Sequence, residues 1–120
     1  MLMNMPEKLL GLPVLSGKKP ALDSYPLFYP LSYEITKGSI GDASCLFLEA
    51  KASIKLPMLL KMAERLQNDF QMPCVVASDS LSKYQIERLV EERIAWINSE
   101  STFFLPFLGL SMRNYGQNKN

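Results

Sequence analysis

The sequence predicts one α/β domain: a mixed sheet of about four or five strands, flanked by two main helices and a short N-terminal helix. Two observations predict the helices, namely a regular apolar stripe after Pro57 and a capping signal at Ser82. A third is the run Cys45–Ala50, which is apolar enough for a strand covered on both faces. The 120 residues, 48% of them hydrophobic, are enough for one domain with a real core. We expect this domain to span residues 1–112, with a flexible polar tail at 113–120.

The N-terminal third contains many turn formers. Asn4 and Pro6 suit the start of a short helix, which Gly11 would end. Residues 12–23 read as a surface loop, because they are rich in Gly, Lys, Pro and Ser. Residues 25–35 are aromatic but interrupted by two prolines, so we expect irregular structure first and a strand at about 31–36.

The middle of the chain predicts a hairpin, a helix and a strand. Residues 37–43 suit a turn in which Gly38 and Gly41 can take positive φ, and Cys45–Ala50 is the next strand. The helix should span 57–70, and residues 73–77 should form a buried strand that requires a crossover if it pairs in parallel. The apolar stripe of the helix comprises Leu59, Met62, Ala63, Leu66 and Phe70.

Residues 79–110 form the stretch around which the rest of the chain is organised. Ser82 is a good N-cap, and Gln85 completes a capping box. The helix should span 83–93, with Arg88 able to pair with Glu92. Residues 94–97 then suit a buried strand, 98–101 a turn, and 103–105 a second strand that Pro106 ends. The apolar surface at this end is an expected interaction surface for a protein partner, formed by Phe103, Phe104, Phe107, Leu108 and Leu110.

The segment KYQIERLVEERIAWINSESTFFLPFLGL resembles the end of the N-terminal domain of a bacterial family of MarR-like, winged-helix transcription regulators. Two departures are Ala95, where the family usually has Pro, and Ser99–Glu100, where it has Pro-Gly. The matching positions are Tyr84 and Leu89 in the helix, Ile94, Trp96 and Ile97 in the first strand, and Phe104, Leu105, Pro106, Leu108 and Gly109 at the hairpin end.

The resemblance implies a non-catalytic regulatory or interaction domain. The winged-helix DNA reader would normally follow it and is absent from this chain. The expected partner is therefore that missing domain or a second copy of the chain. We expect no direct nucleic-acid binding by these residues and no cofactor.

Asp42, Glu49 and Lys51 support an alternative function. They resemble the PD-(D/E)xK arrangement of restriction-endonuclease-like nucleases, in which two carboxylates hold Mg²⁺ or Mn²⁺ and the lysine assists the attacking water. Alternation places Glu49 and Lys51 on one side of a strand. However, Asp42 is not preceded by Pro, and its spacing from Glu49 is short for that family. This alternative predicts a small metal-dependent nuclease with a restriction-endonuclease-like core.

Composition excludes several other classes. The chain has no histidine, which removes the usual general base and metal ligand. Its net charge of +1 argues against a strong electrostatic footprint for nucleic acid. Cys45 and Cys74 lie in apolar runs and are expected to be buried free thiols of a reducing compartment. With no signal peptide and no membrane-spanning run visible, we expect a cytoplasmic protein.

Overall fold

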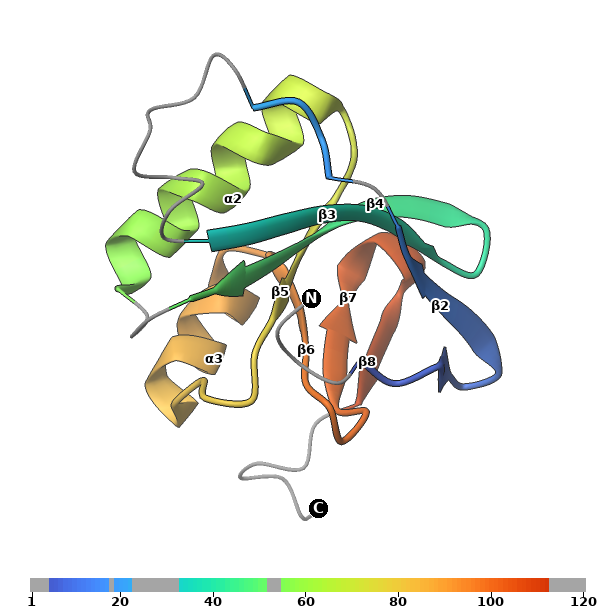
Figure 1. Ribbon diagram of the computed structural model, residues 1–120. Helices are drawn as coiled ribbons and strands as arrows, with labels where there is room; N and C mark the ends of the chain where they lie inside the picture. The colour runs from blue at the N-terminus through green and yellow to red at the C-terminus, as the bar shows by residue number, and fades with distance from the viewer. Residues whose placement is uncertain (1–4, 18, 23–32, 52–54, 113–120) are drawn as a thin grey trace.

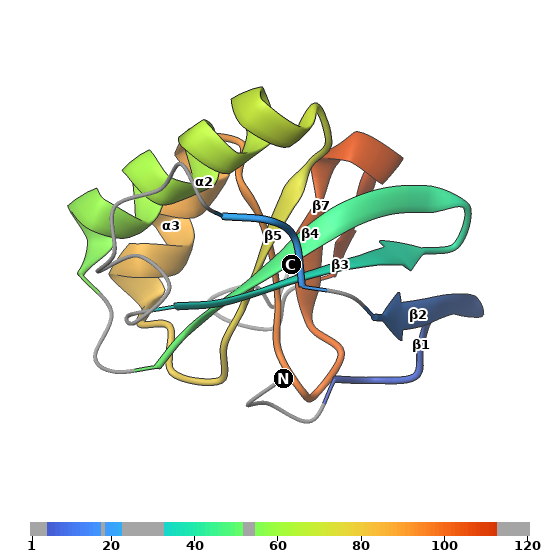
Figure 2. The ribbon, with the colours of Figure 1, turned by 45° about the horizontal axis from the view of Figure 1, so that its top comes forward.

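A computed structural model describes residues 5–17, 19–22, 33–51 and 55–112 of the chain (Figure 1). Seven strands, β2 to β8, form one curled mixed sheet, and the two-residue β1 extends its edge. Two helices lie together on one side of the sheet (Figures 1 and 2). The α/β class is confirmed, and the sheet is larger than the four or five strands predicted. The elements are β1 (Lys8–Leu9), β2 (Leu12–Ser16), β3 (Tyr33–Ile40), β4 (Ala43–Ala50), α2 (Leu56–Phe70), β5 (Cys74–Ala77), α3 (Lys83–Glu91), β6 (Ala95–Ile97), β7 (Phe103–Leu105), the 3₁₀ turn η1 (Pro106–Leu108) and β8 (Leu110–Met112).

The strands are arranged in the sheet in the order in which they occur in the chain. β2, β3 and β4 pair antiparallel, β4, β5 and β6 pair parallel, and β6, β7 and β8 pair antiparallel. The two parallel connections run through α2 and α3. The strands on either side of α2 are therefore parallel neighbours, which is the arrangement that requires a crossover.

Two hydrophobic clusters lie on opposite faces of the sheet. Successive residues of β4 and β5 alternate between them, because strand side chains point to opposite faces. The helix-side cluster includes Ile35, Leu46, Leu48, Val76, Trp96 and Phe104 with Leu59, Met62, Ala63, Leu66 and Leu89 of the helices. The second cluster comprises Leu9, Ile40, Cys45, Phe47, Val75, Ala77, Ala95, Ile97, Phe103 and Leu105. Neither α2 nor α3 contributes a residue to this second cluster, so the curl of the sheet and the β1–β2 hairpin close it.

The predicted signals at the start of α3 are confirmed, and its predicted end is wrong. The Ser82 hydroxyl accepts from the Gln85 N–H at 3.1 Å, and Gln85 Oε1 accepts from the Ser82 N–H at 2.9 Å. The helix ends at Glu91, and Arg93 lies beyond it with φ +56°. The Arg93 N–H donates to the Val90 carbonyl and the Ile94 N–H to the Leu89 carbonyl. This is the Schellman pattern of helix termination, whose left-handed position is usually a glycine.

The predicted N-terminal helix is wrong, because the described part of that region is a β-hairpin. Leu9 pairs with Leu12 across the two residues Leu10 and Gly11, which both have positive φ. Such turns match the natural twist of a hairpin. Leu9, Leu12 and Val14 then face the second cluster, so burial follows the alternation of strands rather than a helical period. The predicted loop at 12–23 likewise begins with strand β2.

The predicted turn at 37–43 is shorter than expected. β3 continues to Ile40, and only Gly41 and Asp42 turn the chain. Gly41 has φ +60°, as predicted, whereas Gly38 pairs with Ser16 inside the sheet. The short strand β8 was not predicted. The predictions for Asn4, for residues 25–32 and for the tail 113–120 lie outside the described residues.

We predict that Gly38→Ala destabilises the domain by about 1–3 kcal/mol, the usual cost of overpacking. A Cβ at Gly38 would lie 2.7 Å from a ring carbon of Phe47 and still closer to the Leu15 carbonyl oxygen. It would therefore push β2 away from β3. Urea unfolding measures the loss. Gly17→Ala is the matched control, because its Cβ would meet only the Lys37 carbonyl, at 3.7 Å. Equal effects of the two substitutions would contradict this packing.

Candidate functional site

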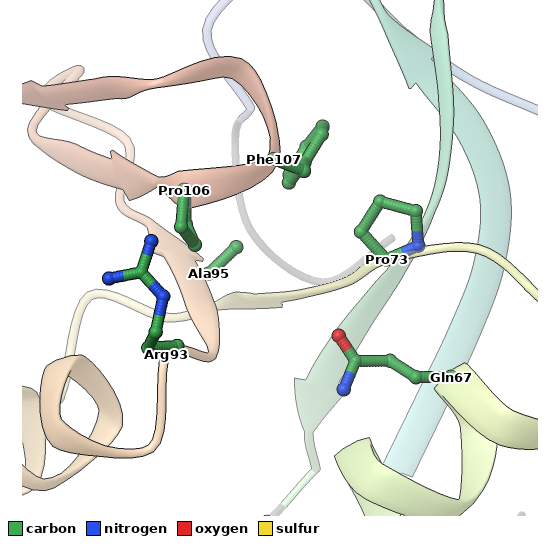
Figure 3. A pocket seen from close by; sticks show the side chains of 6 residues that line it. All are labelled: Gln67, Pro73, Arg93, Ala95, Pro106 and Phe107. Atoms are coloured by element: carbon green, nitrogen blue, oxygen red, sulfur yellow. The ribbon is translucent and has the colours of Figure 1, made fainter.

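A pocket of about 260 Å³ lies where the parallel strands β5 and β6 begin (Figure 3). Pro73 precedes β5, Ala95 opens β6, and Gln67 reaches the pocket from α2. Pro106 and Phe107 of η1 form another wall, and Arg93 of the helix end completes the lining. A smaller pocket of about 180 Å³ shares Gln67 and is otherwise lined by Leu60, Lys61, Glu64, Glu92 and Ile94.

The polar groups of the larger pocket are both hydrogen-bond donors. The Cys74 N–H donates to Gln67 Oε1 at 3.4 Å, which leaves the Nε2 of that amide free to donate. The Arg93 guanidinium has no hydrogen bond or ion pair with any described residue. Arg88, by contrast, pairs with Glu91 at 2.7 Å and with Glu92 at 3.5 Å. The pocket thus presents donors and one positive charge above an apolar lining.

The structure separates the three residues of the nuclease hypothesis. Asp42 is exposed in the β3–β4 turn, whereas Glu49 is 3% exposed near the far end of β4. The six residue steps from Ala43 to Glu49 span about 20 Å at about 3.3 Å per step. Lys51 is exposed just beyond the end of β4. Within the described ranges no three His, Cys, Asp or Glu side chains lie close enough to hold a metal ion. The geometry therefore lends the nuclease mechanism no support.

Part of the expected interaction surface is enclosed in the core of the structure. Phe103 and Phe104 are buried, and they face opposite clusters of the core because they are adjacent in β7. Phe107 and Leu108 are half-buried at the edge of the second cluster. Leu110 lies in β8, which pairs with β7. A run of apolar residues could not distinguish these positions, since strand alternation decides which of them are enclosed.

The β1–β2 hairpin exposes two leucines that the sequence did not indicate as surface residues. Leu10 is 62% exposed and Leu15 is 61% exposed. Leu10 also has φ +50°, a conformation that costs a bulky residue free energy and that Asn or Gly adopts more easily. The Leu10–Gly11 pair between apolar residues was the signal that could have identified this turn.

Polar groups at the opposite edge of the sheet stabilise the loops. Asp79 follows β5, and its carboxylate accepts from the Ser99 N–H at 2.8 Å and from the Ser99 hydroxyl at 2.9 Å. Ser99 follows β6, so this contact joins the ends of two neighbouring strands. The Asn98 side chain accepts from the Glu100 and Thr102 N–H groups within the next turn. The acceptors at this edge are thus engaged in structure.

Comparison with protein-family models, with curated proteins and with solved structures finds no match for this chain. In the part of the chain that the structure describes, neither helix has the length and apolar character needed to cross a membrane. The assignment of function therefore rests on the surface and the pocket themselves.

We predict that both cysteines of the native protein resist thiol reagents at pH 8. They are free and buried, and burial raises the pKa of Cys45 from an ordinary 9.0 to about 12. Burial, followed by the proximity of Cys45, raises the pKa of Cys74 further. Because the thiolate is the reactive form, native reaction should be at least about a hundredfold slower than in urea. Ellman's reagent measures both rates.

The same shift gives a pH dependence of stability. A raised folded-state pKa favours the folded protein fully below pH 9 and progressively less as the pH rises toward 12. Rapid native labelling of Cys45 at pH 8 would contradict its burial.

Proposed function

We propose that this chain is a non-catalytic interaction domain, related to the N-terminal part of a bacterial MarR-like transcription regulator, that associates with a second copy of itself. The relation to the regulator family rests on the residue pattern of 83–110. The docking surface is the hairpin surface, which we define as Leu10, Leu12 and Val14 of the β1–β2 hairpin with Phe107 and Leu108 of η1. A restriction-endonuclease-like core stays a prediction.

The exposure and the backbone conformation of Leu10 are the observations on which this proposal rests. An exposed leucine adds nothing to the core, and a left-handed backbone makes it more costly than Asn would be at the same turn. Backbone strain of this kind concentrates at functional positions. A contact made by Leu10 outside its own domain would account for both features.

The surroundings of Leu10 fit an apolar contact. Leu12 and Val14 of β2 pack on the second cluster together with Phe107 and Leu108, so the two edges of the curled sheet meet at one cluster. All four are only partly buried. Two apolar edges with incomplete cover can be buried further by a partner protein.

A second copy is the occupant that the charge of the chain favours. Its 13 basic and 12 acidic residues give a net charge of +1, so two copies hardly repel each other. The residues of the hairpin surface carry no charge, and the exposed charges beside them in the same hairpin, Glu7 and Lys8, are of opposite sign. A winged-helix module, which follows such domains in the resembled family, is the other occupant that the test addresses.

We predict that Leu10→Asn weakens self-association and at the same time stabilises the fold. The substitution removes an exposed apolar side chain and places Asn in a conformation that it tolerates, which should add about 1 kcal/mol of stability. Sedimentation velocity over a range of concentrations measures association, and thermal unfolding measures stability.

Tyr84→Gln is the matched control, since Tyr84 is 65% exposed on α3, away from the hairpin. It should leave association unchanged. A wild-type chain that stays monomeric at every concentration would overturn the second copy as occupant. A Leu10→Asn variant that associates as strongly as the wild type would overturn the hairpin surface.

A further inference from the structure

We propose that the pocket at the start of β5 and β6 is a binding site for a small carboxylate with an apolar body. This site shares Phe107 with the hairpin surface, and its key residue is Arg93. Four features carry the proposal: the backbone at Arg93, the free state of its guanidinium, the second donor on Gln67 and the apolar lining.

The first feature is the identity of the residue at the end of α3. Position 93 has φ +56° within a Schellman motif, where glycine is the ordinary and least costly residue. An arginine at this position places a long, positively charged side chain where the left-handed backbone favours a residue without a Cβ. The same side chain lines the pocket.

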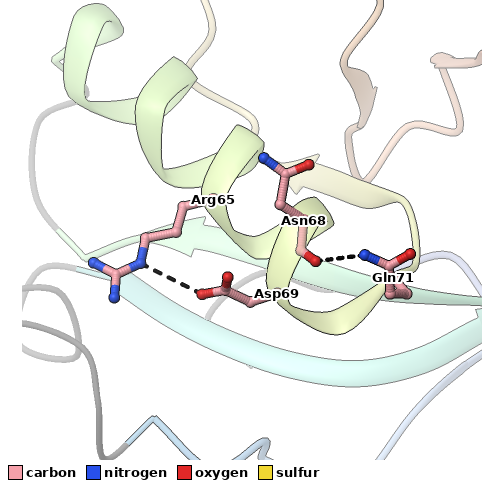
Figure 4. Close-up of polar contacts among 4 residues, drawn as sticks. All are labelled: Arg65, Asn68, Asp69 and Gln71. Atoms are coloured by element: carbon pink, nitrogen blue, oxygen red, sulfur yellow. Dashed lines mark hydrogen bonds and ion pairs between the residues drawn. The ribbon is translucent and has the colours of Figure 1, made fainter.

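The end of α2 shows how a left-handed residue can instead serve its own helix. Gln71 has φ +54°, and its Nε2 donates to the Asn68 carbonyl at 2.6 Å (Figure 4). One turn earlier, Arg65 pairs with Asp69 at 3.4 Å. Gln71 therefore caps the exposed end of α2 with its own side chain. Arg93 makes no such bond within the described ranges.

The second and third features are the donors that the pocket leaves unused. The neighbouring carboxylates of Glu91 and Glu92 are both paired with Arg88, which leaves the Arg93 guanidinium available. Gln67 Oε1 is occupied by the Cys74 N–H, and no described residue accepts from its Nε2. Arg93 and Gln67 lie on different sides of the pocket in Figure 3. A planar guanidinium matches the two oxygens of a carboxylate, and the Gln67 amide on the other side of the pocket is a further donor.

The fourth feature is the size and character of the remaining lining. Pro73, Ala95, Pro106 and Phe107 give it apolar walls. Its volume of about 260 Å³ is below the range of about 300–1,000 Å³ that holds drug-sized molecules. The ligand class is thus a small organic acid whose body packs against the prolines and Phe107 while its carboxylate meets Arg93.

The test uses isovalerate as the probe, with acetate and isovaleramide beside it. Acetate keeps the charge and lacks the apolar body, whereas isovaleramide keeps the body and lacks the charge. Heteronuclear NMR titration of the full chain should show saturable shifts with isovalerate, centred on the side chains of Arg93, Gln67 and Phe107. The two comparison molecules should bind at least about tenfold more weakly, because each lacks one of the two interactions.

Arg93→Gly separates binding from folding. It supplies the residue that the Schellman position prefers, so the variant should melt at the same or a higher temperature while isovalerate binding falls about tenfold or more. Arg93→Lys keeps the charge without the planar fork and should lose part of the affinity. Lys83→Ala removes a cation from the other end of α3 and should change neither property.

Three results would overturn the proposal. These are the absence of saturable shifts at Arg93 with isovalerate, unchanged binding in folded Arg93→Gly, and acetate binding as tightly as isovalerate. The titrations are made with Leu10→Asn as well as with the wild type. An effect of self-association on the NMR shifts can then be distinguished from a loss of isovalerate binding.

Discussion

The burial of both faces of the parallel strands β4, β5 and β6 is the constraint on which the rest of the structure depends. Every residue of β5 is buried, and so is the β4 run from Cys45 to Glu49. One face is covered by the two helices, and the other must be covered by the sheet itself. One cost of such enclosure is visible at Trp96, whose buried Nε1 finds no acceptor among the described residues. An unsatisfied donor of this kind costs about 1–3 kcal/mol.

The need to bury both faces of the sheet also determines where the hairpin surface and the pocket lie. Covering the second face draws the β1–β2 hairpin and the β7–β8 end onto one cluster, and their apolar side chains are only partly enclosed there. The edge where the parallel strands end is occupied by structural contacts such as Asp79 with Ser99. The edge where β5 and β6 begin leaves the pocket beside Arg93. The proposed docking surface and the proposed carboxylate site thus both lie where the two-sided core leaves apolar side chains partly exposed.

The sequence predicted elements whose signals are local. The stripe of α2, the Ser82–Gln85 capping box and the apolar run of β4 each contain their own physical cause. Predictions from the sequence failed where tertiary contacts determine the structure. Leu10 fits an amphipathic helix as well as a hairpin, and the burial of Phe103 depends on strand alternation. Asp42 and Glu49 are close in sequence, but an extended strand separates them. Arg93 could not be recognised, since its importance lies in a backbone angle and a neighbouring pocket.

Native-state hydrogen exchange can show whether the two-sided core carries a weakly held hairpin. We expect the slowest exchange for the amides of β4, β5 and β6, at rates set by global unfolding. We expect much faster exchange for the Leu12 and Val14 amides, because β2 pairs with β1 over only two residues and with β3 over only three. Protection of the Leu12 and Val14 amides equal to that of β5 would contradict this, since the hairpin would then open only when the whole domain unfolds.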